Sequence, residues 1–383
     1  MQPLDAKALT AFSEQLTYPE ERSSDDDGEL RTTLRIAPTV ACAGPLAPLL
    51  NVRAYEGSVP GPTLRVKPGD RLALEGSVEA WPNVTNLHVH GMHVSPSGVA
   101  DNIYRRAGPG DVLEYEYLIP ADHYPGTFYY HPHFEGSSSV QTLGGMSGVI
   151  VVEDPPGTLP VELEAMRDVV MVIQETNVES GSLRNYQSAS KIAGSRMPLY
   201  GERPEESGER STEEDDRSTL LHFVTINGQY QPILAARPGE AMRVRLVHAG
   251  NNDHMYVSVQ SSWRENSGEK REAYPQADNQ AGSSTVGTDV KNGDGGEDEA
   301  AGSCTLLTLA RDGVYLPAPR LQGGGRGHLV LAPGSRADVA LLCDRPGVYR
   351  LFSWKGGRAA EEGGGGPVMD FLGNKTDVFE GES

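Results

Sequence analysis

From Leu30 onward the chain alternates apolar and polar positions over short runs separated by Pro-Gly turns. Runs such as "TLRVKPGDRLALEGSV" from Thr63 and "DVLEYEYLIP" from Asp111 place every second side chain on one face, which is typical of half-buried β-strands. The run "GVIVVED" from Gly148 is continuously apolar, as expected of a fully buried strand. Few stretches show a helical period. The pattern therefore predicts an all-β protein built from sandwiches.

The alternating pattern occurs twice. "KPGDRLALEGSVEAWPN" from Lys67 matches "RPGEAMRVRLVHAGNND" from Arg237, each with Pro-Gly, an acid, a strand and an Asn-bearing turn. "GPGDVLEYEYLIPADHYPGTFYYHPH" from Gly108 likewise matches "APGSRADVALLCDRPGVYRLFSW" from Ala332. Such self-similarity indicates a duplicated unit. We expect two tandem sandwiches, over residues 30–156 and 157–355.

Polar segments flank and interrupt these two units. Residues 177–218 and 264–303 lack an apolar face to bury, so we expect them to be long loop insertions in the second unit. Residues 1–29 and 356–383 are expected to be a flexible N-terminal segment and a flexible tail.

Composition excludes a few classes of partner and of fold, but it does not identify the cellular compartment. The net charge of −20 repels phosphate backbones and argues against nucleic acid. Three cysteines, Cys42, Cys304 and Cys343, exclude a disulfide-dense scaffold and a CxxC zinc site, but leave one disulfide open. No stretch approaches the roughly 20 apolar residues of a membrane span. The N-terminal residues show no signal-peptide pattern.

Two histidine pairs are the candidate metal ligands. His88 and His90 flank one residue, and so do His131 and His133. On a strand, residues two apart share one face and lie about 6–7 Å apart, close enough to bind one metal ion or two neighbouring ones. Pro132 cannot donate to a strand ladder, which favours a position at a rim. Because neutral imidazole binds copper, zinc and iron, the pairs predict a metal site; coincidental surface histidines are the alternative.

The second unit does not repeat the pairs. Phe352 and Trp354 stand where the first unit has His131 and His133. Val257 and Val259 lie near the positions of the other pair. We therefore expect a metal-binding first sandwich and an architectural second one.

These motifs resemble a known family. "NLHVHGMHVSPSGVADN" with "IPADHYPGTFYYHPHFEGSSSVQTLGGMSGVIVVED" resembles the first cupredoxin domain of laccase-like multicopper oxidases. "VTINGQYQPILAARPGEAMRVRLVHAGN" and "LVLAPGSRADVALL" look like the second domain of their three-domain members. The resemblance covers most of the chain outside the insertions and termini. It implies Greek-key cupredoxin sandwiches and copper as the cofactor.

The resemblance also implies a reaction and ligand roles. In the family, electrons from a reducing substrate, a small molecule or a metal ion, pass to a trinuclear copper cluster that reduces O2 to water. By position, His88 would bind the type 2 copper, His90 and His131 one type 3 copper, and His133 the other. Asp101 falls where the family often has an acid near the cluster, to orient a ligand and relay protons; the alternative is a turn aspartate. Family members favour an exported compartment.

Half of the family's ligand set is not found here. The remaining four histidines and the type 1 cysteine lie in HxxHxH and HCH stretches of a third domain, and neither stretch occurs in this sequence. The expectation is a chain with two of three domains, whose histidine rim is covered by a partner domain or chain. The alternatives are a copper-binding module without oxidase chemistry, an inactive fragment, or a purely structural sandwich.

Several nearby residues are expected to have other roles. His93 is interpreted as structural, since a continued strand would point it away from His90. Met92 and Met146 are soft enough to bind copper but are expected to be packing residues. Glu135 stands beside the second pair, where its carboxylate would change the surroundings of the ligands.

Overall fold

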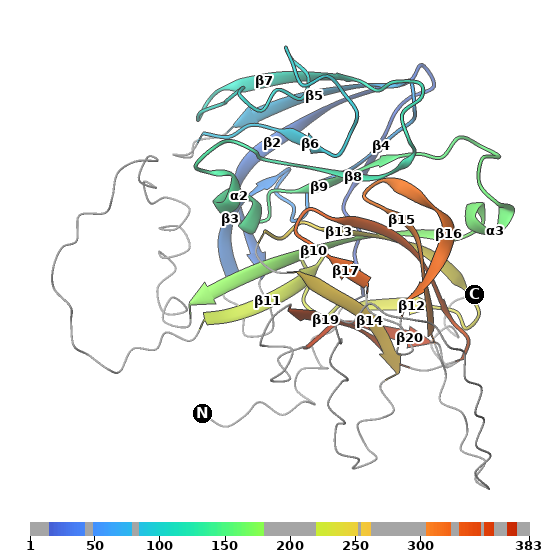
Figure 1. Ribbon diagram of the computed structural model, residues 1–383. Coiled ribbons are helices and arrows are strands. Elements are labelled where there is room, and N and C mark those ends of the chain that lie inside the picture. Colours follow the sequence, from blue (N-terminus) through green and yellow to red (C-terminus); the bar gives the residue numbers. More distant parts are fainter. Residues whose placement is uncertain are drawn as a thin grey trace, which may run out of the picture.

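The computed structural model describes residues 15–42, 49–78, 84–179, 220–251, 254–261, 304–322, 329–345, 348–355 and 366–373. Within these ranges strands predominate, and they form four sheets packed as two sandwiches (Figure 1). This confirms the all-β prediction.

The first sandwich contains the histidine pairs. Its five-stranded sheet has the order β1-β4-β9-β8-β6, formed by Glu21–Ser23, Thr63–Val66, Gly148–Val152, Gly126–His131 and His88–His90. Its four-stranded sheet has the order β3-β2-β5-β7, formed by Leu49–Tyr55, Glu29–Cys42, Arg71–Val78 and Val112–Leu118.

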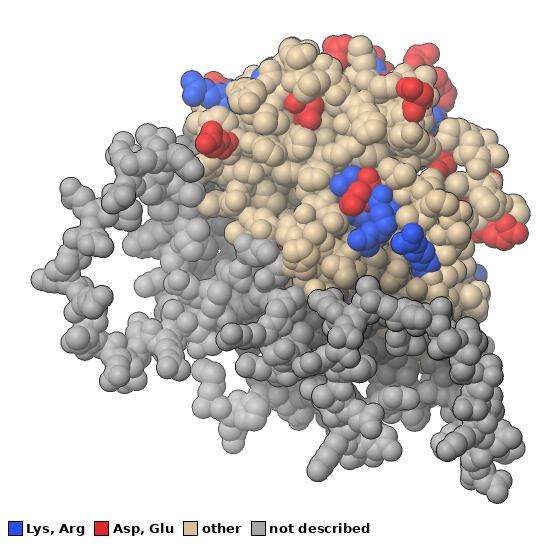
Figure 2. Space-filling view, in the orientation of Figure 1, with Lys and Arg blue, Asp and Glu red and all other residues tan. Residues whose placement is uncertain are grey.

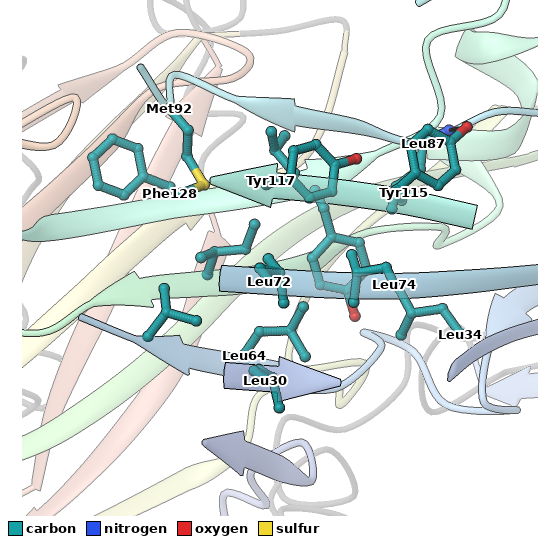
Figure 3. Packing of buried hydrophobic residues seen from close by; sticks show 14 of the residues in the cluster. Leu30, Leu34, Leu64, Leu72, Leu74, Leu87, Met92, Tyr115, Tyr117 and Phe128 are labelled. Atoms are coloured by element: carbon teal, nitrogen blue, oxygen red, sulfur yellow. Dashed lines mark hydrogen bonds between the residues drawn. The ribbon is translucent and has the colours of Figure 1, made fainter. Parts of the chain in front are cut away.

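Alternating side chains from both sheets fill the core of this sandwich (Figure 3). Leu72 and Leu74 of β5 lie between Leu34 of β2 and the rings of Tyr115 and Tyr117 of β7. Each large apolar side chain buried in this way contributes about 1.5–3 kcal/mol of transfer free energy. The alternation predicted from the sequence therefore supplies the main driving force for this sandwich.

The second sandwich is the larger one. Its six-stranded sheet has the order β11-β10-β13-β18-β15-β16, formed by Leu220–Ile226, Arg167–Glu179, Ala241–His248, Arg336–Cys343, Cys304–Arg311 and Val314–Gln322. Its five-stranded sheet has the order β12-β20-β19-β14-β17, formed by Ile233–Ala236, Gly366–Gly373, Val348–Lys355, Met255–Ser261 and Leu329–Leu331. A disulfide between Cys304 and Cys343 joins β15 to β18.

Two short helices accompany the strands. Helix α2 (Ser138–Leu143) follows the second histidine pair, and α3 (Val161–Glu164) precedes β10. No helix in the described ranges has the length and apolar character that a membrane crossing requires.

Parts of the two ends that were expected to be flexible are paired or packed in the structure, namely residues 15–29 and 366–373; residues 1–14, 356–365 and 374–383 lie outside the described ranges. Leu16 is buried in the core of the second sandwich, and its amide donates to Ile233 O at 2.7 Å. Strand β1 then pairs in parallel with β4 of the first sandwich. In the predicted tail, β20 pairs with both β19 and β12. A single apolar anchor or a free strand edge is enough to order a segment that looks weak in composition.

The predicted insertions lie mostly outside the described residues. The first was expected to begin at residue 177, but β10 continues to Glu179 and pairs with β11 from Leu220. Residues 180–219 and 262–303 are not among the described ranges.

The two sandwiches pack directly on each other through apolar side chains, mostly valines. Tyr129, Val149 and Val151 of the first contact a cluster from the second comprising Val170, Val172, Val247 and Ala249. Strand β9 is therefore buried on both faces, as the unbroken run "GVIVVED" predicted. Side chains would not fit at some backbone contacts: a Cβ at Gly126 would lie 2.7 Å from Gly313 O.

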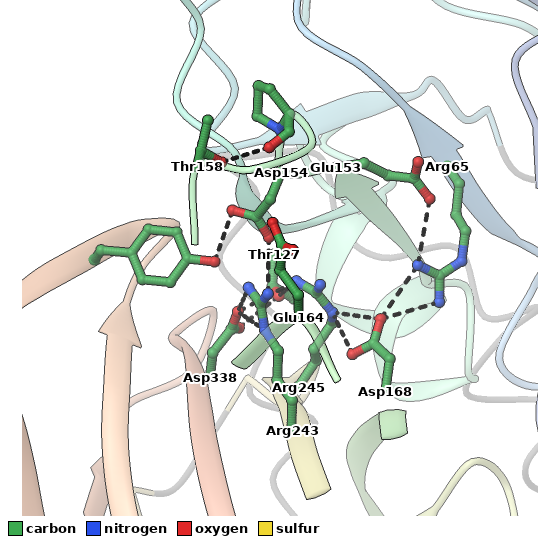
Figure 4. Close-up of polar contacts among 12 residues, drawn as sticks. Arg65, Thr127, Glu153, Asp154, Thr158, Glu164, Asp168, Arg243, Arg245 and Asp338 are labelled. Atoms are coloured by element: carbon green, nitrogen blue, oxygen red, sulfur yellow. Dashed lines mark hydrogen bonds and ion pairs between the residues drawn. The ribbon is translucent and has the colours of Figure 1, made fainter. Parts of the chain in front are cut away.

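Buried ion pairs lie at the same boundary (Figure 4). The Asp338 carboxylate accepts from Arg243 at 2.6 Å, from Arg245 at 3.2 Å and from the Thr127 hydroxyl at 2.5 Å. Burial alone would raise the pKa of Asp338, but the two guanidinium groups hold it below its ordinary value. A second carboxylate, Asp168, binds Arg245 and also Arg65 of the first sandwich. The boundary is thus fixed by charge pairing as well as by apolar packing.

Charged side chains are sparse on the face of the molecule that Figure 2 shows. Figure 2 shows scattered Asp and Glu side chains over the first sandwich and one group of Lys and Arg near the boundary between the sandwiches. On this face the net charge of −20 is not gathered into a single acidic patch.

Candidate metal centre

Strand pairing brings the two histidine pairs together. Strand β6 is the edge strand of its sheet and pairs antiparallel with β8, which places His88 opposite His131 and His90 opposite Tyr129. Strand β8 ends at His131, so Pro132 follows directly where the ladder stops. The pairs therefore lie at the rim of the first sandwich.

Three of the four histidines converge. One ring nitrogen each from His88, His90 and His131 lies within 4.8 Å of the other two. His90 Nδ1 and His131 Nε2 are 3.2 Å apart. The distance suits two nitrogen ligands of one ion, because metal–nitrogen bonds of roughly 2.0–2.1 Å put tetrahedral ligands about 3.3–3.4 Å apart.

Hydrogen bonds fix which nitrogens are free to bind. His131 Nδ1 donates to Pro132 O at 2.9 Å, which leaves the Nε2 lone pair open. His88 Nδ1 lies 2.9 Å and 3.0 Å from the two Asp101 carboxylate oxygens, which likewise leaves Nε2 open. A ligand histidine held by a second hydrogen bond is the usual arrangement in metal sites.

Burial keeps the imidazoles neutral. It lowers the pKa of His90 to about 4, with the nearby Arg336 charge and His88 adding to the effect. It lowers the pKa of His131 to about 3, again helped by His88 and His90. Both rings are therefore uncharged at pH 7, which is the form that binds a metal ion.

His133 lies apart from this cluster. Its side chain is exposed, and its ring centre is 5.1 Å from that of His88 and 6.0 Å from that of His131. Its backbone amide donates to Asn86 Oδ1 at 2.7 Å, which fixes the turn after β8. The structure thus brings together three of the predicted ligands and places the fourth beside them, open to solvent.

Asp101 contacts β6 through its side chain. Besides lying beside His88 Nδ1, its carboxylate accepts from the backbone amide of Val89 at 3.0 Å, and its side chain is only 13% exposed. These contacts hold the carboxylate against the His88 ring, as a residue that orients His88 would require.

Asp101→Asn is expected to weaken copper binding by roughly 10–100-fold while the fold is retained, because the amide cannot hold the His88 ring as the carboxylate does. Competition of the purified chain with a chelator for Cu²⁺ measures this. Asp122→Asn, which changes an exposed acid, is the matched control. Equal affinities of the two variants would contradict the positioning role.

The second sandwich also contributes to this centre, which the sequence did not predict. A Cβ at Gly334 would lie 3.0 Å from His90 Cε1 and 3.2 Å from the Tyr129 hydroxyl, so the β17–β18 turn packs on the ligand. A Cβ at Gly91 would collide with the guanidinium of Arg336. Arg336 is buried and donates to Thr127 O and to Gly334 O, both at 3.2 Å. No local sequence signal marks these residues, which approach from more than 200 positions away.

Aromatic stacking completes the surroundings of the ligands. The Tyr129 ring stacks on His90 with ring centres 4.6 Å apart and on His131 at 4.8 Å. Tyr129 is buried, and burial raises its pKa to about 12. It therefore restricts both rings without adding charge.

The remaining candidate residues have structural positions. His123 accepts from the His93 amide at 3.0 Å and lies 2.8 Å from Tyr124 O, so both of its ring nitrogens are occupied. The His93 side chain is exposed. Met92 and Met146 are buried in the first core, as packing residues are. Glu135 is exposed, and no contact of its carboxylate with a ligand is recorded among the described residues.

The donor set fits copper. Three converging imidazoles, two of them held by a carboxylate and a carbonyl, match the nitrogen ligation that copper prefers. Zinc also binds imidazole nitrogen, so the geometry narrows the ion to copper or zinc.

Known proteins with similar sequences are multicopper oxidases. Residues 46–157, which include both histidine pairs, match the sequence model of a family described as multicopper oxidase. A multicopper oxidase of Staphylococcus haemolyticus is 26% identical over 205 residues, covering 52% of this chain and 38% of the relative. An iron transport multicopper oxidase of Candida glabrata is 32% identical over 123 residues, covering 31% of this chain and 18% of the relative. The chain thus spans well under half the length of these relatives.

Solved structures agree on the fold. A multicopper oxidase from Campylobacter jejuni superposes with a TM-score of 0.63 at 19% identity, covering 99% of this chain and 67% of that one. A blue copper oxidase from Nitrosomonas europaea superposes with a TM-score of 0.55 at 19% identity, covering 95% of this chain and 91% of that one. The sandwiches are therefore cupredoxin-like, as predicted. Both histidine pairs lie inside the matched segment, so the first sandwich is similar to a multicopper oxidase domain.

Proposed function

We propose that this chain binds copper through His88, His90, His131 and His133 and forms part of an oxidase that couples oxidation of a reducing substrate to reduction of O2. The convergence of three imidazole nitrogens within 4.8 Å carries the proposal. Copper bound there would supply the electron transfer to O2. The protein's own contribution is to fix the ligands, keep His90 and His131 neutral and hold protons nearby.

The ligands divide by their position on the strands. His90 Nδ1 and His131 Nε2 approach to 3.2 Å diagonally across the β6–β8 pair, and the two residues are assigned to one ion. His88, held by Asp101, and the exposed His133 face neighbouring ions. Because Asp101 is the carboxylate nearest to the ligands, it is also the residue we assign to hold a proton for reduced oxygen.

The exposed side of the centre implies a partner. His133 is open to solvent, and β6 has a neighbour on one side only. We propose that a further domain or a second chain covers this rim and adds the remaining ligands. The substrate, a small molecule or a metal ion, would then reach copper through that partner.

A copper-binding module without oxidase chemistry is the second candidate function. It is favoured by the cysteines: Cys304 and Cys343 are joined in a disulfide, so neither can supply a type 1 copper thiolate. The same disulfide supports an exported, oxidising compartment.

Spectroscopy of the copper-loaded chain tests both candidates. Cu²⁺ added to the chain is expected to give an electron paramagnetic resonance signal with nitrogen coupling and no intense band near ~600 nm, since such a band needs a cysteine thiolate beside histidines. Absence of nitrogen coupling would overturn the proposal. An intense blue band would overturn the ligand set. Oxygen uptake with a reducing dye separates the oxidase from the binding module.

A further inference from the structure

A histidine and a glutamate lie side by side, fully buried, inside the second sandwich. His248 is the last residue of β13, and Glu175 lies on the neighbouring strand β10. Both side chains are 0% exposed, and His248 Nε2 is 3.6 Å from Glu175 Oε1. Strands β10 and β13 pair in parallel with Ile173 opposite His248, so Ile173, Glu175 and His248 share the face toward the second core.

The equivalent position of the first sandwich is apolar. Aligning the segments from Lys67 and Arg237 puts His248 where the first sandwich has Val78. Val78 is buried in the first core. The second sandwich has therefore replaced a core valine with an ionisable ring and placed a carboxylate beside it. Burying such groups is unfavourable unless each polar atom finds a partner.

No protein partner serves these atoms. Both Glu175 oxygens and both His248 ring nitrogens are buried without a hydrogen-bond partner among the described residues. The 3.6 Å separation exceeds that of a good hydrogen bond. The amide oxygen of Asn251, three residues beyond His248, is buried and unpaired as well.

The separation fits two ligands of one ion. Zinc-class ions bind imidazole nitrogen and carboxylate oxygen at roughly 2.0–2.2 Å, so tetrahedral ligands lie about 3.3–3.6 Å apart. The backbone closes over the pair at Gly250, where a Cβ would lie 2.8 Å from His248 Nε2 and 3.1 Å from Glu175 Cγ. Any larger residue at that position would displace one of the two side chains.

We propose that His248 and Glu175 form a second, structural cation site for a divalent ion of the zinc class, separate from the histidine cluster. The ion neutralises the Glu175 carboxylate and accepts the His248 lone pair, and water or the Asn251 amide oxygen completes its coordination. It ties the end of β13 to β10 inside the second sandwich.

Zinc binding to the full chain tests the proposal. The variant His88→Ala/His131→Ala removes the histidine cluster, and it is expected to keep one tightly bound Zn²⁺ after dialysis. Adding Glu175→Gln, which preserves size but removes the charge, is expected to weaken this binding at least 100-fold. Elemental analysis and calorimetry with Zn²⁺ alone provide the readouts.

Two further measurements distinguish loss of the zinc site from misfolding of a variant. His248→Val restores the residue of the first sandwich, and is expected to fold without the ion, as judged by circular dichroism. Crystals of the unmutated chain refolded with Zn²⁺ should give an anomalous peak between His248 Nε2 and Glu175 Oε1. No zinc in the His88→Ala/His131→Ala chain, equal stoichiometry with and without Glu175→Gln, or no peak would each overturn the site. None of these results depends on copper binding at the histidine cluster.

Discussion

Replacing both His88 and His131 with alanine is expected to abolish copper binding at the histidine cluster. The change removes two of the three nitrogens that converge within 4.8 Å and leaves only His90 of that group, with the exposed His133 beside it. Copper affinity should therefore fall by more than the roughly 10–100-fold expected when only the positioning carboxylate is altered. Copper content after dialysis, together with the nitrogen coupling of the Cu²⁺ signal, measures the loss.

The matched control changes two histidines that lie outside the cluster. His93 and His254 are exposed, and neither is among the converging ligands. The variant His93→Ala/His254→Ala should keep the copper stoichiometry of the unmutated chain. If both double variants retain copper equally, the histidine cluster is not the copper site.

Asp338→Asn is expected to lower the free energy of unfolding by about 3–5 kcal/mol, because it leaves the Arg243 and Arg245 charges buried with too little compensation. The carboxylate is 2% exposed and also accepts from Thr127 of the first sandwich. The loss should therefore affect both the second core and its contact with the first. Urea denaturation followed by fluorescence and by circular dichroism measures it.

An exposed ion pair of the same sandwich boundary is the control. Glu153 is 38% exposed and lies 3.7 Å from Arg65, so Glu153→Gln should cost less than about 1 kcal/mol. A loss for Asp338→Asn as small as that of Glu153→Gln would show that the buried network contributes specificity rather than stability.

The sequence could predict the strands and the histidine pairs because both depend on local periodicity. Alternation with a period of two defines a half-buried strand, and it also puts His88 and His90 on one face. Asp101 was weighed as a turn residue or as a neighbour of a ligand, and its 2.9 Å contact with His88 Nδ1 favours the neighbour.

Contacts between distant segments could not be predicted. Gly334 and Arg336 approach His90 only because the two sandwiches pack along β9 and β10. Nothing in the sequence near them indicates a site in the other unit. The expectation that the second sandwich is purely architectural was incomplete for the same reason.

The strand pairing in the second sandwich also differs by one residue from the alignment of the two repeats, which had placed Val257 and Val259 near the positions of His88 and His90. Phe352, matched to His131, pairs with Ser258 rather than with a valine. Val257 faces the second core instead. A shift of one residue reverses the face of every side chain on a strand, so alignment of short repeats is least reliable at this level.

The path of the N-terminal residues has a consequence for how the molecule can be divided. The chain anchors Leu16 in the second sandwich before it forms β1 on the edge of the first, and only later returns to build the second. A fragment cut at residues 30 and 156 would uncover the edge of β4 and discard that anchor, exposing a strand edge that invites aggregation. We therefore expect a chain that begins before Leu16 and contains both sandwiches to be more soluble than either sandwich expressed alone.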